Sequence, residues 1–173
     1  MMKAATAFLF ALSLSAVSAQ DMPSEVAKIV PQPEMLGQSS TRILGITLYE
    51  GQLFTSQGAD FSYAEPFALT LTYRRNFSGA ALAKATIDEI ARIEGADQSD
   101  LQSLIPLFEN CFPDVAKGER ITATGPKANT IEVYKNGTRT CRAQDAGLRK
   151  RFFDIWLSAQ SRDPQGAAQL KGS

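Results

Sequence analysis

The chain has 173 residues, of which 44% are hydrophobic, and its 18 basic residues equal its 18 acidic ones in number. A chain without excess positive charge lacks the electrostatic footprint of a nucleic-acid binder, so we expect no nucleic-acid partner. It contains no histidine, which excludes histidine-based acid–base catalysis, Ser-His triads and histidine-ligated zinc or haem.

The N-terminal residues are typical of a secretory signal peptide. Lys3 is followed by an apolar stretch over residues 4–17 and by the small-residue site Val17-Ser18-Ala19. We expect cleavage after Ala19, which removes residues 1–19 and leaves a periplasmic or secreted chain. A retained membrane anchor is the alternative, but the stretch is short for a transmembrane helix. No later stretch is long and apolar enough to span a bilayer.

Residues 20–40 contain three prolines and no sustained hydrophobic period, so we interpret them as an N-terminal arm that packs on the domain. A single domain is expected over residues 41–173. Its first strand is predicted at residues 42–49, with a short continuation at 52–55 beyond a glycine.

The segment FALTLTYRR, residues 67–75, has the clearest strand pattern in the chain. Its side chains alternate along the segment, which predicts a half-buried strand with one face toward the core. That core face would carry Phe67, Leu69, Leu71, Tyr73 and Arg75.

Two helices are predicted next. Ser78 can cap the first, in which apolar residues recur at helical spacing from Leu82 to Ile93. Its adjacent acidic residues, 88 and 89, point about 100° apart. We therefore interpret them as a solvated face and not as a catalytic pair of carboxylates. The second helix begins near residues 99–100, and Pro106 should kink or restart it.

Three further strands are predicted at residues 120–124, 130–135 and 138–142. Asn136-Gly137 joins the last two, and this dipeptide strongly favours a type I′ hairpin turn because both central residues of that turn need positive φ. The hairpin therefore fixes how the last two strands pair.

The final helix contains the densest apolar run of the exported chain, FFDIWL at residues 152–157. With Asp145 as N-cap, its apolar residues form one stripe and its charged residues lie off that stripe. This pattern favours a helix packed on the core; a ligand-lining helix and a membrane-surface helix are the alternatives. The order strands, two helices, strands, helix predicts an α+β fold, a large antiparallel β-sheet with a layer of α-helices on one face.

Cys111 and Cys141 are the only two cysteines, and export would place them where disulfides persist. We expect a Cys111–Cys141 bridge, with two buried free thiols as the alternative. The cysteines form no CxxC motif, and the sequence has no GxGxxG or Walker-type loop. We therefore predict neither a metal site nor a cofactor.

The chain resembles the bacterial chalcone isomerase-like proteins, an exported branch of the chalcone isomerase fold family, in five ordered segments: LYEGQLF, PFALTLTYRRNFSGAALAKATIDEIARI, FPDVAKGERI, YKNGT and FFDIWL. The resemblance runs from about Leu44 to the C-terminal end. It implies a large antiparallel sheet, a helical layer and a cleft between them. In plant enzymes of this fold the cleft cyclises chalcones to flavanones, and in related plastid proteins it holds fatty acids without catalysis.

The catalytic residues of the plant enzymes do not carry over. Their tyrosine and asparagine correspond to Leu82 and Glu89 here, and neither side chain can do that work. The chain therefore resembles a non-catalytic member of the fold. An isomerase or lyase acting on an enone-like substrate is the alternative.

A small amphipathic, fatty-acid-like ligand is the leading functional hypothesis. If the core face of residues 67–75 lines the cleft, an acyl chain would lie along its aliphatic residues beside Tyr73, and its carboxylate would meet the Arg75 guanidinium. Arg42 is the second candidate, because it would share a strand face with Leu44. In the opposing interpretation Tyr73 ends the core and Arg75 lies in solvent. A structural or partner-binding envelope protein is a further alternative.

Overall fold

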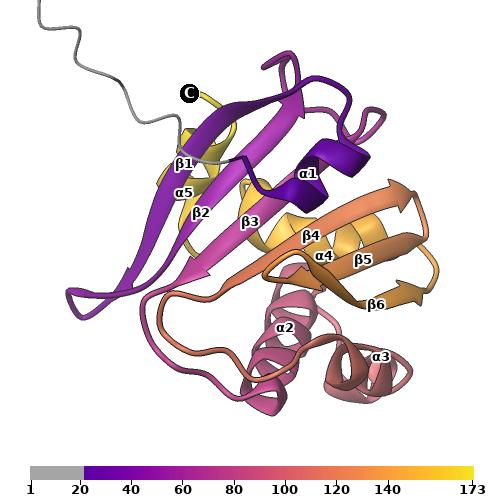
Figure 1. Ribbon diagram of the computed structural model, residues 1–173. Helices are drawn as coiled ribbons and strands as arrows, with labels where there is room; N and C mark the ends of the chain where they lie inside the picture. Colours follow the sequence, from indigo (N-terminus) through magenta and orange to yellow (C-terminus); the bar gives the residue numbers. More distant parts are fainter. Residues whose placement is uncertain (1–21) are drawn as a thin grey trace, which may run out of the picture.

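The computed structural model describes residues 22–173, so the signal peptide expected over residues 1–19 lies outside the described residues (Figure 1). Its centre is a six-stranded sheet in which every neighbouring pair is antiparallel and the strands follow one another in chain order. The strands are β1 (Pro33–Ile43), β2 (Ile46–Ser56), β3 (Phe67–Tyr73), β4 (Arg120–Lys127), β5 (Thr130–Lys135) and β6 (Thr138–Gln144).

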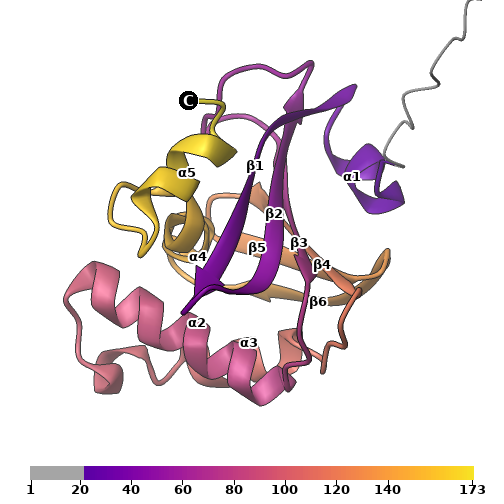
Figure 2. The ribbon, with the colours of Figure 1, turned by 90° about the vertical axis from the view of Figure 1, so that its left-hand side faces the viewer.

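The helices lie on both faces of this sheet, mostly on one. They are α1 (Ser24–Ile29), α2 (Gly79–Glu94), the 3₁₀ helix η1 (Gln98–Leu101), α3 (Leu104–Cys111), α4 (Leu148–Leu157) and α5 (Pro164–Leu170). Figure 2 shows α4 and α5 on one side of β1–β3 and α1 on the other. The expected α+β architecture is confirmed, with α1 as an addition on the opposite face. None of the helices within residues 22–173 has the length and apolar character needed to cross a membrane.

The strand predicted at residues 42–49 is wrong, because a turn lies within this range. Residues 42–49 do not form one strand, because β1 ends at Ile43 and β2 begins at Ile46. Leu44 and Gly45 between them both have positive φ, 49° and 78°. A two-residue loop of this kind is a type I′ turn, which normally takes Asn or Gly at its first position. Because Leu44 is apolar, the sequence pattern did not indicate a turn at this position.

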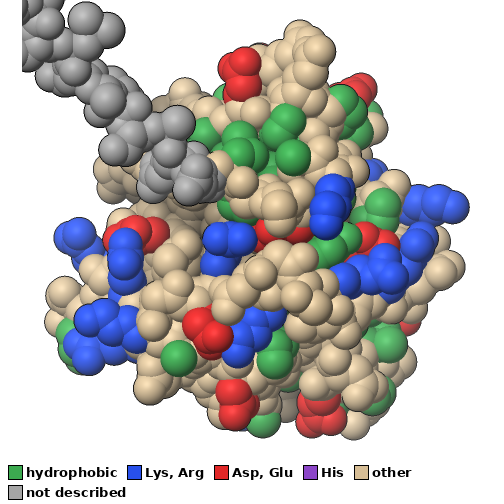
Figure 3. Space-filling view, viewed as in Figure 1, with side chains coloured by type: hydrophobic (Ala, Val, Ile, Leu, Met, Phe, Trp, Pro, Cys, Tyr) green, Lys and Arg blue, Asp and Glu red, His purple; other side chains and the backbone are tan. Residues whose placement is uncertain are grey.

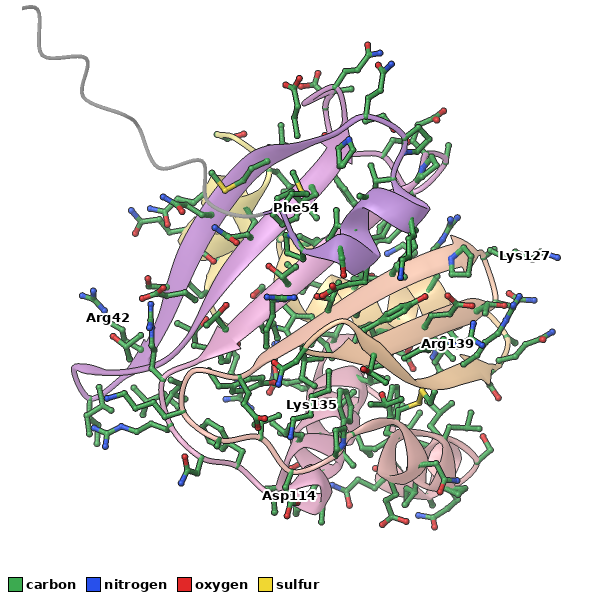
Figure 4. All side chains as sticks on the ribbon, in the orientation of Figure 1. Arg42, Phe54, Asp114, Lys127, Lys135 and Arg139 are labelled. Atoms are coloured by element: carbon green, nitrogen blue, oxygen red, sulfur yellow. A yellow bond between two sulfur atoms is a disulfide. The ribbon has the colours of Figure 1, made fainter. Side chains whose placement is uncertain are left out.

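Strand β3 is confirmed, but it is buried on both faces and not half-buried as predicted. Its second face is covered by α1, where Val26 and Val30 pack with Phe54 and Ala68 in a small separate core. Phe54 is labelled between α1 and the sheet in Figure 4. Residues 20–40 therefore include a helix and most of β1, in addition to extended chain.

A buried carboxylate fixes α1 to the sheet. Glu25 is fully buried and accepts hydrogen bonds from the Thr122 hydroxyl at 2.6 Å and from the Arg120 guanidinium at 3.0 and 3.1 Å. Burial alone raises the pKa of Glu25, but the bonds from Thr122 and Arg120 outweigh it and the pKa is lowered. The charged carboxylate is thus the form that the fold stabilises.

The helices α2 and α3 follow the sequence predictions. The Ser78 hydroxyl accepts a hydrogen bond from the Ala81 N–H at 3.2 Å, as an N-cap does. Pro106 lies in the first turn of α3, where a missing N–H costs no helical hydrogen bond, and the short helix η1 precedes it. The helix predicted near residues 99–100 is therefore two helices with a break before the proline.

The C-terminal half is also close to prediction, apart from one cap. Asn136 and Gly137 have φ of 48° and 88° and form the expected hairpin turn between β5 and β6. In α4, the predicted apolar stripe packs on the core. The predicted N-cap Asp145 is wrong: α4 begins after Gly147, and the Asp145 carboxylate lies 3.4 Å from the Arg151 guanidinium instead.

The predicted disulfide is present. Cys111 at the end of α3 and Cys141 on β6 are joined, with 4.9 Å between their Cα atoms. Because β6 is the edge strand of the sheet, this bond fastens the helical layer to one end of the sheet.

Candidate ligand cavity

An apolar cavity of about 320 Å³ lies between the sheet and the helices α2 and α4. Strands β2, β3 and β4 supply one wall and the two helices the other. Its lining includes Leu48, Tyr49, Leu69, Leu71, Tyr73, Ile121 and Ala123 from the sheet and Leu82, Ala85, Thr86, Glu89, Phe152, Ile155 and Trp156 from the helices. A mostly apolar hollow with a few polar groups is the usual form of a small-molecule site.

The alternation of β3 explains why its residues reach this cavity. Leu69, Leu71 and Tyr73 lie on the helix-covered face of the strand and line the cavity, as the sequence pattern predicted. Phe67 lies on the same face but is not part of the lining. Its ring instead packs edge-on against Phe153, with 4.7 Å between ring centroids. Phe67 therefore closes the core beyond the cavity.

Tyr73 is the polar group of β3 in the cavity wall. The chain has four tyrosines, and three of their hydroxyls bond to side chains: Tyr49 with Trp156, Tyr63 with Asp154 and Tyr134 with Glu132. The Tyr73 hydroxyl has no such partner among the described residues. Burial and the neighbouring Tyr49 raise the pKa of Tyr73, so its hydroxyl stays protonated and is free to donate to a ligand.

Tyr49 and Trp156 separate the cavity from a second hollow. The indole Nε1–H of Trp156 donates to the Tyr49 hydroxyl at 3.0 Å, and burial raises the pKa of Tyr49. A neighbouring hollow of about 240 Å³ shares both residues and continues toward α5. Ile43 and Arg162 belong to its lining. The Tyr49–Trp156 pair is therefore a shared wall between an inner and an outer compartment.

Glu89 lies in the lining of both compartments, which corrects its interpretation as part of a solvated face. Its side chain is only 14% exposed. The Arg92 guanidinium lies 2.9 Å from one carboxylate oxygen, and Arg162 contacts the other. Asp163 also lines the outer compartment, so the two guanidinium groups face two carboxylates and leave no surplus charge there. The contact with Arg162 spans 73 residues, so local spacing did not reveal it.

Neither predicted arginine belongs to the cavity lining. Arg75 lies beyond the end of β3, is exposed and borders a surface hollow with Arg74 and Lys117. Arg42 does not share a strand face with Leu44, because the turn at residues 44–45 intervenes, and it borders a separate polar hollow. Arg75 lies after the last residue of β3 and Arg42 lies next to the last residue of β1, so both guanidinium groups lie outside the inner compartment.

Leu82 and Glu89, the two residues that the sequence resemblance compares with the plant catalytic positions, both line the cavity. Leu82 contributes only aliphatic surface, and Glu89 is paired with two arginines. Within residues 22–173, no cluster of three or more Asp, Glu, Cys or His side chains could hold a metal ion. The arrangement can enclose an apolar molecule and donate a hydrogen bond from Tyr73.

The fold and the cavity define an antiparallel α+β protein with an apolar hollow between sheet and helices. The chain belongs to the chalcone isomerase-like family, whose sequence model matches residues 42–170. A crystal structure of a fatty-acid binding protein from Arabidopsis thaliana has the same fold, with a TM-score of 0.60 and 13% sequence identity over 83% of this chain and 89% of that one. A search of curated protein sequences found no match.

Proposed function

We propose that the protein is an exported, non-catalytic module that binds a small amphipathic, fatty-acid-like molecule in the cavity between sheet and helices. The observation that carries this proposal is the apolar cavity of about 320 Å³, lined by one tyrosine hydroxyl that bonds to no side chain within residues 22–173. The structurally similar Arabidopsis protein is a fatty-acid binding protein, which supports the same ligand class for this chain.

The chemistry of the wall suggests how the ligand is oriented. Leu69, Leu71 and Ala123 offer only hydrocarbon, so an acyl chain would lie along them and gain from leaving water. The rings of Tyr49 and Tyr73, with centroids 5.9 Å apart, both belong to the cavity lining. The ligand carboxyl would accept a hydrogen bond from the Tyr73 hydroxyl.

Two measurements test the ligand class. Lipid extracted from the purified protein and analysed by mass spectrometry should contain fatty acids or other single-chain amphiphiles. Adding fatty acids of increasing length should raise the melting temperature, because a ligand that binds only the folded state stabilises it. A protein that carries no lipid and shows no thermal shift with any fatty acid is not an acyl binder.

Export is part of the proposal and has separate support. The disulfide between Cys111 and Cys141 is typical of oxidising compartments, and the N-terminal residues are typical of a signal peptide. Fractionation of expressing cells should recover a chain that begins at Gln20. Recovery of uncleaved chain from the reducing cytosol would contradict this part.

A further inference from the structure

We propose that the tip of the β1–β2 hairpin, residues 43–46, docks the protein on an anionic phospholipid bilayer. Ile43, Leu44 and Ile46 are 57%, 97% and 46% exposed. These three are most of the large hydrophobic side chains that the described part of the chain leaves exposed. Exposed apolar residues gathered at one place usually mark an interaction surface.

The conformation of Leu44 is a second, independent observation. Leu44 adopts φ of 49° in the turn, a region that asparagine and glycine occupy with less strain. Two features of Leu44 are therefore unfavourable: its positive φ and the almost complete exposure of its apolar side chain. Unfavourable local conformations of this kind are concentrated at functional sites.

Basic residues surround the apolar tip. Arg42, Arg74, Arg75 and Lys117 are exposed, and Glu50 is the acidic residue that borders the same hollows. Arg74 binds Glu50, with its Nε 3.0 Å from a carboxylate oxygen, which leaves three positive charges unmatched. Figure 4 shows Arg42 beside this projecting hairpin, and basic side chains gather at the same side of the surface in Figure 3.

This combination fits a bilayer better than a protein partner. A stable protein interface buries about 800 Å² on each partner, far more than a turn of four residues can cover. A few apolar side chains inserted at the headgroup level, with arginines and lysines against anionic lipid, suffice for reversible membrane binding. The basic collar therefore selects a negatively charged lipid surface.

The tip also lies beside the cavity. Ile43 lines the outer compartment, which shares Tyr49 and Trp156 with the inner one. A bilayer at the tip would thus adjoin the opening of the outer compartment. Docking itself depends only on the exposed tip and its charges, so it stands or falls independently of what the cavity binds.

Vesicle sedimentation with the chain starting at Gln20 tests this inference. We expect binding to vesicles containing phosphatidylglycerol, little binding to pure phosphatidylcholine, and loss of binding at about 0.5 M NaCl. Leu44→Asn should lower the partition coefficient roughly tenfold, because one leucine side chain no longer leaves water. Asparagine suits the turn, so this variant keeps the hairpin.

Matched variants isolate the surface. Arg42→Ser with Arg75→Ser should lower vesicle binding at least about tenfold, whereas Lys127→Ser with Arg139→Ser removes as much charge from the other end of the sheet and should change it little (Figure 4). Met35→Gln, an exposed apolar residue elsewhere on β1, is the control for Leu44. Absence of vesicle binding, or an equal loss in the control variants, would overturn the proposal. Fatty-acid affinity without vesicles should be unchanged in every tip variant.

Discussion

At the scale of single residues, the tyrosines of the chain have different tasks. Tyr63 donates to the buried Asp154 carboxylate at 2.8 Å, whose other oxygen is paired with Lys150, so both oxygens are satisfied. Tyr73 donates to no described side chain and faces the cavity. The same residue type therefore serves stability at one position and, in our proposal, ligand recognition at the other.

Replacing Tyr73 by phenylalanine should weaken fatty-acid binding about five- to tenfold and leave the melting temperature nearly unchanged. The reason is that the hydroxyl has no side-chain partner in the described part of the chain but would donate one hydrogen bond, worth roughly 1 kcal/mol, to the ligand carboxyl. Fluorescence of Trp156, the single tryptophan and a cavity residue, reports the affinity. Tyr134→Phe, remote from the cavity, is the control. Unchanged affinity in Tyr73→Phe would place the carboxyl elsewhere.

Replacing Arg75 by alanine separates the sequence-based hypothesis from the structural one. Arg75 is exposed and outside the cavity lining, so fatty-acid affinity in vesicle-free solution should stay within about twofold of the unchanged protein. The same titration of Trp156 fluorescence measures it. A loss of ten times or more would show that the ligand carboxylate does reach this guanidinium.

At the scale of elements, α1 depends on one carboxylate. The pKa of Glu25 is lowered from its ordinary 4.5, so the unfolded chain takes up a proton before the folded one does as pH falls. The contribution of Glu25 is therefore complete above about pH 4.5 and is lost as pH drops through its folded pKa. Arg120 is partly exposed, which lets water moderate the effect.

Glu25→Gln should lower the free energy of unfolding at pH 7 by about 2 kcal/mol, because the charge-assisted bonds from Arg120 and Thr122 are lost. The difference between the variant and the unchanged protein should shrink as pH falls below 4.5. Urea unfolding at pH 7 and in acid measures both effects. A difference that grows in acid would contradict this assignment of charge.

The disulfide is the other element-scale fastening. It closes a loop of 30 residues, so reduction should cost roughly 3 kcal/mol of stability. Intact mass of the exported protein should lie two hydrogen masses below the reduced form. Cys111→Ser with Cys141→Ser should reproduce the stability of the reduced protein, and a double variant as stable as the oxidised one would refute the estimate.

At the scale of the whole molecule, the antiparallel sheet, its hairpin at 136–137 and its helical layer could be predicted from sequence, because alternation and turn residues are local signals. The β1–β2 turn could not, since Leu44 does not resemble a residue with positive φ. Of the cavity wall, Leu69, Leu71 and Tyr73 followed from the strand period. The Trp156–Tyr49 and Glu89–Arg162 contacts join segments that are distant in the sequence. They could not be predicted, because local sequence patterns carry no signal for such contacts.

The central claim is that the cavity between sheet and helices holds an acyl chain, and a blocked cavity tests it most directly. Ala80 and Ala85 are both exposed on α2, but only Ala85 belongs to the cavity lining. Isothermal titration with a fatty acid should show binding by the unchanged protein and by Ala80→Phe, and at least a tenfold loss in Ala85→Phe, whose ring occupies the space of the chain. Equal affinity of Ala85→Phe and Ala80→Phe would contradict the account.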